Sequence, residues 1–213
     1  MSANVQSFFH AATSTWSHIV TDAATRTTAI IDPVLEFDPA SGRVWPESAQ
    51  QLLARIREHG LRVEWILETH AHADHLSAAD WLKHALDGMP KTGIGAGIVA
   101  VQRYFRDVFD LGPDFAIDGS QFDRLFDDGD EFQLGALDVR VIATPGHISD
   151  GVSYRIGDAV FVGDTLFAPQ AGTGRCDFPG ADAAMHYRSI QRLYALPDAT
   201  RVFVCHDYPA AGV

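Results

Sequence analysis

The chain alternates between short runs of β-branched or aromatic residues and longer segments with helical spacing. Strand-like runs cover residues 15–20, 27–31, 62–68, 92–96, 152–156, 159–162 and 200–205, and a hairpin is expected over 129–147. Helical spacing predicts helices at 46–59, 77–86, 98–109 and 182–196. Strands in runs, interleaved with helices, predict an α/β fold in which helices cover the outer faces of a sheet sandwich.

Turn and capping residues mark the ends of several of these elements. Pro46 near a first turn and Gly60 just past a last turn are typical of a helix start and stop. Ser77 stands where it can cap the second helix. The two hairpins are expected to turn at 135–136 and 157–158, because each pair begins with glycine.

Composition and charge limit the class of protein. The 213 residues are enough for one domain with a substantial core, and we expect residues 1–213 to form a single domain. The hydrophobic content of 46% is ordinary for a soluble globular protein. A formal net charge of -12 argues against a nonspecific nucleic-acid partner. No apolar run approaches the length of a membrane span, so no membrane partner is expected.

The cysteines and the N-terminus bear on the cellular compartment. Cys176 and Cys205 are too few for a disulfide framework, and we expect them to be free thiols in a reducing compartment. The N-terminal residues lack a basic segment followed by an apolar one, so no signal peptide is expected. Both features predict a cytoplasmic location.

Residues 70–75 contain an unusual density of metal-binding side chains, namely His70, His72, Asp74 and His75. They follow the apolar run 63–67, where a strand is expected to end and a loop to begin. If the chain stays extended, alternation places His70, His72 and Asp74 on one side. Imidazoles and a carboxylate together form a ligand set that divalent transition metals bind.

Three further candidate ligands follow later strand-like runs. They are His147, Asp164 and His206, which stand after runs 139–143, 159–162 and 201–204. Each alone has an ordinary structural explanation as a turn or strand-end residue. Strands that end at one edge of a sheet bring such residues together, however, and the glycines before His147 and Asp164 permit sharp chain reversals. The whole set therefore predicts a metal site.

These segments resemble those of a known superfamily. Thr-His-Ala-His-Ala-Asp-His (69–75), Thr-Pro-Gly-His (144–147), Gly-Asp (163–164) and His206 resemble the metal motif of the metallo-β-lactamase fold. The resemblance spans residues 15–208. It implies a four-layer αββα sandwich, with the metal site at one edge of the two sheets.

Three other segments narrow the resemblance to one group within this superfamily. Gly-Thr-Gly-Arg-Cys-Asp-Phe-Pro (172–179) and Cys-His-Asp-Tyr (205–208) look like the persulfide dioxygenases, also called sulfur dioxygenases, which are relatives of the glyoxalase II hydrolases. Asp-Pro-Val (32–34) fits the bacterial branch of that group. The resemblance implies one Fe(II) per chain, held by His70, His147 and Asp164 as the catalytic centre. Two histidines and one carboxylate leave open positions that suit non-haem iron chemistry.

The implied substrates are glutathione persulfide and O2, and the implied products are sulfite and glutathione. The other candidate ligands would then orient the first three or form a vestigial second site; these are His72, Asp74, His75 and His206. A glyoxalase II-like hydrolase of thioesters is the main alternative, with one or two Zn(II) ions. In that enzyme class His70, His72 and His147 would hold one metal, Asp74, His75 and His206 the other, with Asp164 between them.

The ligand set alone does not decide between these alternatives, because every side chain needed for two metals is present. A third hypothesis is a non-catalytic, metal-bearing persulfide sensor. Missing ligands would support it, and none is missing. The segment around Arg175 favours the dioxygenase, since a guanidinium can bind a carboxylate of a glutathione conjugate through paired hydrogen bonds.

Three neighbours of these motifs complete the candidate substrate-binding residues. Tyr208 could offer its hydroxyl to substrate, and Phe178 is expected to form a pocket wall. Cys176 follows Arg175, whose charge would lower the pKa of the thiol and make it reactive, although a small buried residue is the preferred interpretation. Structural burial is also expected for Cys205.

The C-terminus departs from the family pattern. Members usually continue past the His-Asp-Tyr segment with helical structure that helps to close the substrate pocket, whereas this chain ends at Val213. A C-terminal truncation is one expectation, with metal binding retained and substrate affinity weakened. A homodimer is expected only through the resemblance.

Overall fold

The computed structural model describes residues 1–208. The first half contains β1 (Asn4–His10), β2 (Thr15–Thr21), β3 (Thr27–Ile31), β4 (Val34–Asp38), β5 (Arg43–Trp45), α1 (Glu47–Glu58), β6 (Arg62–Leu67), β7 (Leu76–Ser77), α2 (Ala79–Ala85) and β8 (Lys91–Gly95). The second half contains α3 (Ile98–Val108), β9 (Arg124–Phe126), β10 (Glu131–Leu134), β11 (Leu137–Ala143), β12 (Val152–Ile156), β13 (Ala159–Phe161), the 3-10 turn η1 (Gly163–Thr165), α4 (Ala183–Tyr194) and β14 (Arg201–Phe203).

Two sheets form the centre of the fold. The first has six strands in the order β1-β2-β3-β6-β8-β9, and the second has five in the order β10-β11-β12-β13-β14. Strands β3, β6, β8 and β9 run parallel to one another, so their carboxyl ends meet at one edge of the first sheet. A small third sheet, β5-β4-β7, extends from the first.

The main core lies between the two sheets because alternate residues of facing strands point inward. Val20, Ile31 and Leu67 of the first sheet belong to the same buried cluster as Val141 and Tyr154 of the second. Burying apolar surface contributes about 25 cal/mol per Å², so this layer supplies much of the stabilisation of the fold.

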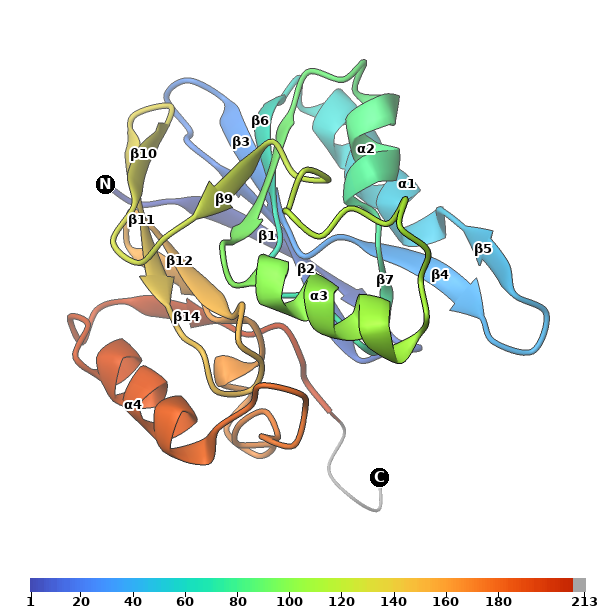
Figure 1. Ribbon diagram of the computed structural model, residues 1–213. Coiled ribbons are helices and arrows are strands. Elements are labelled where there is room, and N and C mark those ends of the chain that lie inside the picture. Colours follow the sequence, from blue (N-terminus) through green and yellow to red (C-terminus); the bar gives the residue numbers. More distant parts are fainter. Residues whose placement is uncertain (209–213) are drawn as a thin grey trace.

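Helices cover both outer faces. α1 and α2 pack on the first sheet through a cluster that includes Leu52, Leu82 and Ile66. On the other side, α4 packs on the second sheet, where Leu193 contacts the cluster of Val160 and Val162. Figure 1 shows α4 and the pair α1 and α2 on opposite sides of the stacked sheets. The predicted αββα sandwich is therefore confirmed.

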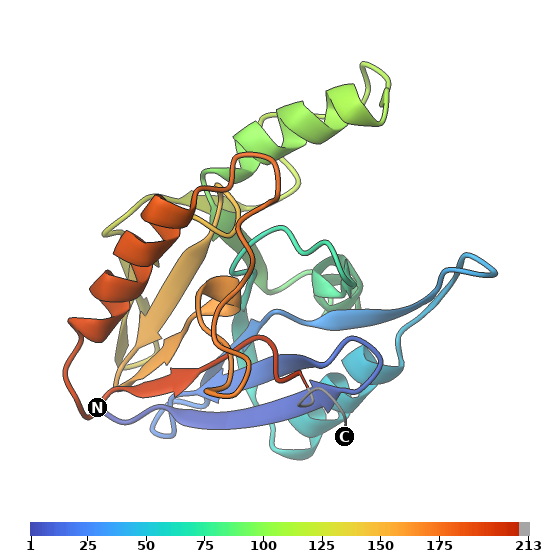
Figure 2. The ribbon, with the colours of Figure 1, turned by 90° about the horizontal axis from the view of Figure 1, so that it is seen from below.

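Two elements extend from this sandwich. In the view of Figure 2, α3 projects from the body of the molecule, and the β4–β5 hairpin projects in a different direction. The base of α3 is anchored by a small cluster that includes Ile94, Ile98 and Ile148. Within residues 1–208, no helix combines the length and apolar character needed to cross a membrane.

The expected strands and helices agree with the structure, but several strands were not predicted. The hairpin turns at 135–136 and 157–158 are as expected. Strands β1, β4, β5, β7 and β9 were missed: most are short, and several lie at sheet edges or in the projecting hairpin. Ser77 accepts a hydrogen bond from the Ala79 N–H at 3.0 Å, although Ala78 is the capping residue of α2.

We expect Leu52→Ala to lower the free energy of unfolding by about 2–5 kcal/mol, because Leu52 is 1% exposed between α1 and the first sheet and its loss leaves a cavity. Val202→Ala is the control, since Val202 is 52% exposed and its truncation should change stability by less than about 0.5 kcal/mol. Urea unfolding measures both. Equal effects would contradict this assignment of the core.

Candidate metal centre

The histidine-rich segment begins where β6 ends. It forms bends and coil instead of a continued strand, so the condition for a row of ligands on one side of an extended chain is not met. His70 and His72 nevertheless lie together, with ring centroids 4.1 Å apart, while the ring of His75 is 4.2 Å from that of His72. Asp74 instead points to His206, with Oδ2 2.7 Å from Nε2.

A buried carboxylate fixes the start of this segment. Asp32, at the end of β3, has a φ of 49° and accepts hydrogen bonds from the Thr69 N–H at 2.7 Å and the Thr69 hydroxyl at 2.9 Å. Because the Thr69 hydroxyl donates to Asp32, its oxygen can accept from Nδ1 of His70, 3.0 Å away. This arrangement leaves Nε2 of His70 as the nitrogen with a free lone pair.

His147 is oriented from a different direction. Its Nδ1 donates to the backbone carbonyl of Arg175 at 2.7 Å, so its Nε2 is also left with a lone pair. The preceding Gly146 has a φ of 138°, and a Cβ there would collide with the backbone of His186 in α4. Glycine at this position therefore allows β11 to turn sharply and lets α4 pack against the turn.

Asp164 completes a group of three. It lies in η1 directly after β13, and its Oδ2 is 3.4 Å from Nε2 of His147 and 3.9 Å from Nε2 of His70. The candidate ligand atoms of these three residues all lie within 4.8 Å of one another. The other carboxylate oxygen, Oδ1, lies 2.6 Å from Nδ1 of His206.

His206 joins two carboxylates at the centre of the site. It is fully buried, and its two ring nitrogens face Asp164 and Asp74. Burial alone would lower its pKa, but the hydrogen bonds with Asp164 and Asp74 raise the pKa of His206 to about 9. With both nitrogens engaged, His206 holds the orientation of Asp164.

A second cluster of candidate ligands lies beside the first. His72, Asp74 and His75 offer ligand atoms within 4.8 Å of one another. Nε2 of His72 lies 3.2 Å from Asp32, while its buried Nδ1 has no hydrogen-bond partner, and neither does either nitrogen of His75. Buried polar atoms without partners are rare in proteins, and a metal ion would satisfy these nitrogens.

The protonation states of two of the histidines, His70 and His75, suit metal binding, whereas, despite burial, the neighbouring carboxylates raise the pKa of His72 and His206. Burial, together with the charge of His72, lowers the pKa of His70 to about 3 and that of His75 to about 4. Both imidazoles are therefore neutral at pH 7, as a ligand must be. Nitrogen and carboxylate donors in these clusters fit a divalent transition metal.

A cavity of about 550 Å³ opens onto the first cluster, large enough for a small-molecule substrate. His70, His147 and Asp164 lie at its base. The other residues that line it are Ala73, Asp74, Phe167, Thr173, Arg175, Phe178 and Tyr208. The sequence motifs at 172–179 and 205–208 therefore contribute directly to the cavity wall.

Aromatic rings pack against the histidines in this cavity. Phe178 contacts His147 edge-on with ring centroids 5.0 Å apart, and the Arg175 guanidinium lies over Phe178 at 4.4 Å. Tyr208 stacks on His206 at 5.1 Å, and Phe167 meets both rings edge-on. Arg175 is largely exposed and forms an ion pair with Asp177 at 3.0 Å.

The cysteines do not form part of the cavity wall. Burial, followed by the charges of Asp177 and Asp182, raises the pKa of the Cys176 thiol, which agrees with the preferred interpretation of an unreactive residue and not with activation by Arg175. Cys205 is 1% exposed, and burial also raises the pKa of its thiol. Both are free cysteines, and the structure gives neither the features of an activated thiol.

Asp150 is a residue of the site that the sequence did not reveal. It is 2% exposed, and its Oδ2 accepts a hydrogen bond from the Ala71 N–H at 2.8 Å. It therefore ties the turn after His147 to the segment that carries His70. A Cβ at Gly95 or Gly97 would collide with the backbone of Asp150, so both glycines are needed for this packing.

Comparison with known proteins identifies the family. A family model described as the metallo-beta-lactamase superfamily matches residues 12–206. The chain belongs to this superfamily. A probable metallo-hydrolase of Burkholderia pseudomallei (strain 1710b) is 50% identical over 98% of the chain and 74% of the relative. Glyoxylase B2 of Dictyostelium discoideum is 46% identical over 97% of the chain and 71% of that protein.

A solved structure of the superfamily is also similar. The crystal structure of ETHE1 from Myxococcus xanthus has a TM-score of 0.74 and 31% identity, over 99% of this chain and 77% of that one. Some relatives are much longer: the chain spans 48% of the beta-lactamase hydrolase-like protein of Agrobacterium fabrum, to which it is 47% identical over 98% of its own length. These similarities confirm the superfamily and leave the reaction open between oxygenase and hydrolase.

We expect Thr69→Val to weaken metal binding by about 10–100-fold, because it removes the hydroxyl that links His70 to Asp32 while preserving side-chain volume. Competition with a chromophoric chelator for Zn(II) measures the affinity. Thr173→Val is the matched control, since Thr173 lines the same cavity but its hydroxyl bonds only the Gly174 carbonyl. Equal affinities for the two variants would contradict this role of Thr69.

Asp150 predicts a pH dependence of stability. Burial raises the pKa of its carboxyl from 3.8 to about 6, so the folded state favours the protonated form. The stabilisation is present below about pH 4 and is lost as the pH rises to about 6. Asp150→Asn cannot ionise and keeps an acceptor for Ala71. It should match the wild type near pH 4 and exceed its free energy of unfolding at pH 7 by about 3 kcal/mol.

Urea unfolding of chelator-treated protein at several pH values between about 4 and 7 measures this difference. A difference between the wild type and Asp150→Asn that stays constant over that range would show that the Asp150 carboxyl does not titrate as described.

Proposed function

We propose that the chain is a persulfide dioxygenase that oxidises glutathione persulfide with O2 to sulfite and glutathione, at one Fe(II) held by His70, His147 and Asp164. The observation that carries the proposal is the hydrogen bonding of this trio. Nε2 of each histidine keeps its lone pair and faces Oδ2 of Asp164, while His206 engages the other carboxylate oxygen. Two histidines and one carboxylate are the ligand set of non-haem Fe(II) oxygenases.

Iron, when bound, would supply the redox chemistry with O2 that Zn(II) lacks. The chain's own residues would bind and position the substrate. Arg175 at the cavity mouth would exchange its ion pair with Asp177 for a carboxylate of glutathione. Phe167, Phe178 and Tyr208 would limit access of water to the persulfide end.

Tyr208 would act as a neutral hydrogen-bond donor in this reaction. Burial, followed by the charges of Asp164 and Asp74, raises the pKa of Tyr208 to about 12, so its hydroxyl keeps its proton at neutral pH. Over the reaction, the terminal sulfur of the persulfide gains both atoms of O2 and one oxygen from water. The sulfur–sulfur bond then breaks, which releases sulfite and leaves glutathione as the thiol.

A dinuclear thioester hydrolase is the second candidate, and a specific observation favours it. The unpartnered nitrogens of His72 and His75, together with Asp74, form a second group of donors next to the first. His206 could join them by giving up its hydrogen bond to Asp74. Such a site would bind one or two Zn(II) ions and would hydrolyse a glutathione thioester. The names of similar proteins, which include a probable metallo-hydrolase and glyoxylase B2, support this alternative.

Other features of the proposal follow from the resemblance and from the cysteines. The homodimer and the single-domain organisation stay predictions. A cytoplasmic location is part of the proposal because both cysteines are free and suit a reducing compartment. A metal-bearing persulfide sensor would have the same cavity and would bind the persulfide without consuming O2.

The proposal is tested by anaerobic loading with Fe(II), followed by measurement of O2 uptake and sulfite formation with glutathione persulfide. We expect equal amounts of O2 consumed and sulfite formed. Absence of O2 uptake, combined with two bound metals and hydrolysis of a glutathione thioester, would move the assignment to the hydrolase. Tight persulfide binding with neither activity would favour the sensor.

Arg175→Gln should raise KM for glutathione persulfide by about tenfold and leave kcat within about twofold, because it removes a carboxylate contact remote from the reacting sulfur. Steady-state O2 uptake measures both constants. Arg103→Gln is the control, since it removes the same charge from an exposed position that does not line the cavity. A KM unchanged in Arg175→Gln would contradict the assigned role of Arg175.

A further inference from the structure

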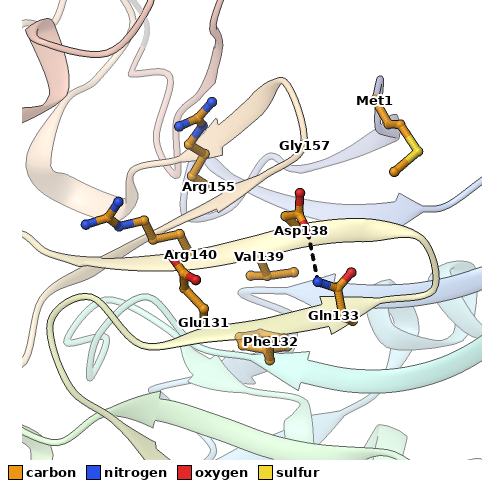
Figure 3. A pocket seen from close by; sticks show the side chains of 9 residues that line it. All are labelled: Met1, Glu131, Phe132, Gln133, Asp138, Val139, Arg140, Arg155 and Gly157. Carbon is orange, nitrogen blue, oxygen red and sulfur yellow. Dashed lines mark hydrogen bonds between the residues drawn. The ribbon is translucent and has the colours of Figure 1, made fainter.

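A second set of charged side chains lies on the outer face of the second sheet, away from the face that packs in the core. Arg140 of β11 and Arg155 of β12 are directly opposite each other in the strand register. Figure 3 shows both side chains extending on the same side of their strands. Like charges directly opposite on neighbouring strands repel, so this pairing destabilises the sheet unless another group compensates it.

No carboxylate in residues 1–208 compensates either charge by a close ion pair. Neither Arg140 nor Arg155 has a carboxylate oxygen within 4.0 Å, although half of the chain's arginines do. Glu131 is opposite Arg140 on its other side but forms no such contact. On a chain with a net charge of -12, two adjacent arginines without a carboxylate partner form an unusual local excess of positive charge.

A third arginine closes the group. Arg192 of α4 donates to both oxygens of Asp128, at 2.8 and 3.0 Å, and to the Ala143 carbonyl at 2.7 Å. Its guanidinium is therefore fixed in place at the edge of the helix. Asp128 pairs with Arg192, and Glu131 is opposite Arg140 in the strand register, so these three arginines exceed their neighbouring carboxylates by one charge.

These three arginines surround a small hollow of about 160 Å³ whose other lining residues, Ile142 and Leu196, are apolar. At ~30 Å³ per water molecule, it has room for roughly five waters, or for an anion with a similar number of heavy atoms. Ile142 is 7% exposed, so this wall belongs to the packed contact between α4 and the sheet. The hollow therefore combines a fixed apolar wall with guanidinium donors.

A larger hollow of about 440 Å³ adjoins the small one and shares Arg140 and Arg155 with it. Glu131, Gln133 and Asp138 line the larger hollow, as Figure 3 shows, and Gln133 donates to Asp138 at 2.8 Å. The carboxylates of Glu131 and Asp138 thus line the larger hollow, whereas the small hollow is lined by the three arginines and the apolar wall. An anion would be favoured in the small hollow and disfavoured in the larger one.

We propose that Arg140, Arg155 and Arg192 form an oxyanion-binding site that takes an anion of the size of phosphate or sulfate. Guanidinium groups bind such oxyanions through paired, charge-assisted hydrogen bonds. The lining of the hollow contains three guanidinium groups and no carboxylate, and its volume of about 160 Å³ is enough for such an anion. This site is separate from the metal centre, and the proposal does not depend on the reaction catalysed there.

Isothermal titration of the metal-loaded protein with inorganic phosphate, and in a second arm with sulfate, tests the site. We expect R140Q and R155Q each to weaken binding of both anions by about tenfold, and acetate to bind more weakly than either dianion. The matched control is R188Q, which removes one exposed charge of α4 that does not line the hollow and should change the affinity by less than about twofold.

The side-chain Nε–H signals of the arginines in NMR spectra provide a second measurement, and circular dichroism checks that each variant is folded. Phosphate binding that is equally strong in the wild type, R140Q and R155Q would show that the anion binds at the metal or through net charge, which overturns the proposal. Equal loss of affinity in R188Q, or no detectable binding of either dianion, would overturn it as well.

Discussion

The buried carboxylate of Asp32 is the constraint on which the metal centre depends. It lies at the end of β3, accepts two hydrogen bonds from Thr69 and contacts Nε2 of His72. A buried charge is costly unless hydrogen bonds satisfy it, and here every bond comes from the segment that carries the candidate ligands. The hydrogen bonds that satisfy the buried Asp32 carboxylate therefore also fix the orientation of His70 and His72. The parallel pairing of β3 with β6 brings these segments together.

Hydrogen-bond partners also fix other histidines of the site. Carbonyl, hydroxyl and carboxylate groups behind the histidines decide which ring nitrogen carries a proton and which keeps a lone pair. For His70 and His147 this leaves Nε2 free toward Asp164, while His206 is held between two carboxylates. One cluster thus has the donor set of a non-haem iron site. The adjacent nitrogens of His72 and His75 keep the dinuclear alternative chemically reasonable. The same arrangement of residues would serve the oxygenase and the hydrolase, and the identity of the bound metal would decide which reaction occurs.

Local signals in the sequence predicted the candidate ligands and the sandwich, because each ligand directly follows an apolar strand-like run and a turn. Those signals do not depend on distant residues. Of the missed strands, β4, β5, β7 and β9 are two to five residues long and are defined by their pairing partners, while β1 has seven residues and lies at the edge of the first sheet. Asp150 and Thr69 could not be recognised for a similar reason. Asp150 acts on a segment 79 residues away and Thr69 on one 37 residues away, and no local pattern records such contacts. For Cys176 the preferred prediction of an unreactive residue agrees with the structure, because burial and Asp177, and not its sequence neighbour Arg175, dominate the environment of the thiol.

The most direct test of the central claim is the location of the metal, measured by anomalous diffraction at the iron edge from anaerobically Fe(II)-loaded crystals. We expect one anomalous peak per chain, with Nε2 of His70, Nε2 of His147 and an oxygen of Asp164 as its protein ligands. A peak bound by His72, Asp74 and His75, or two peaks of equal strength, would contradict the mononuclear assignment.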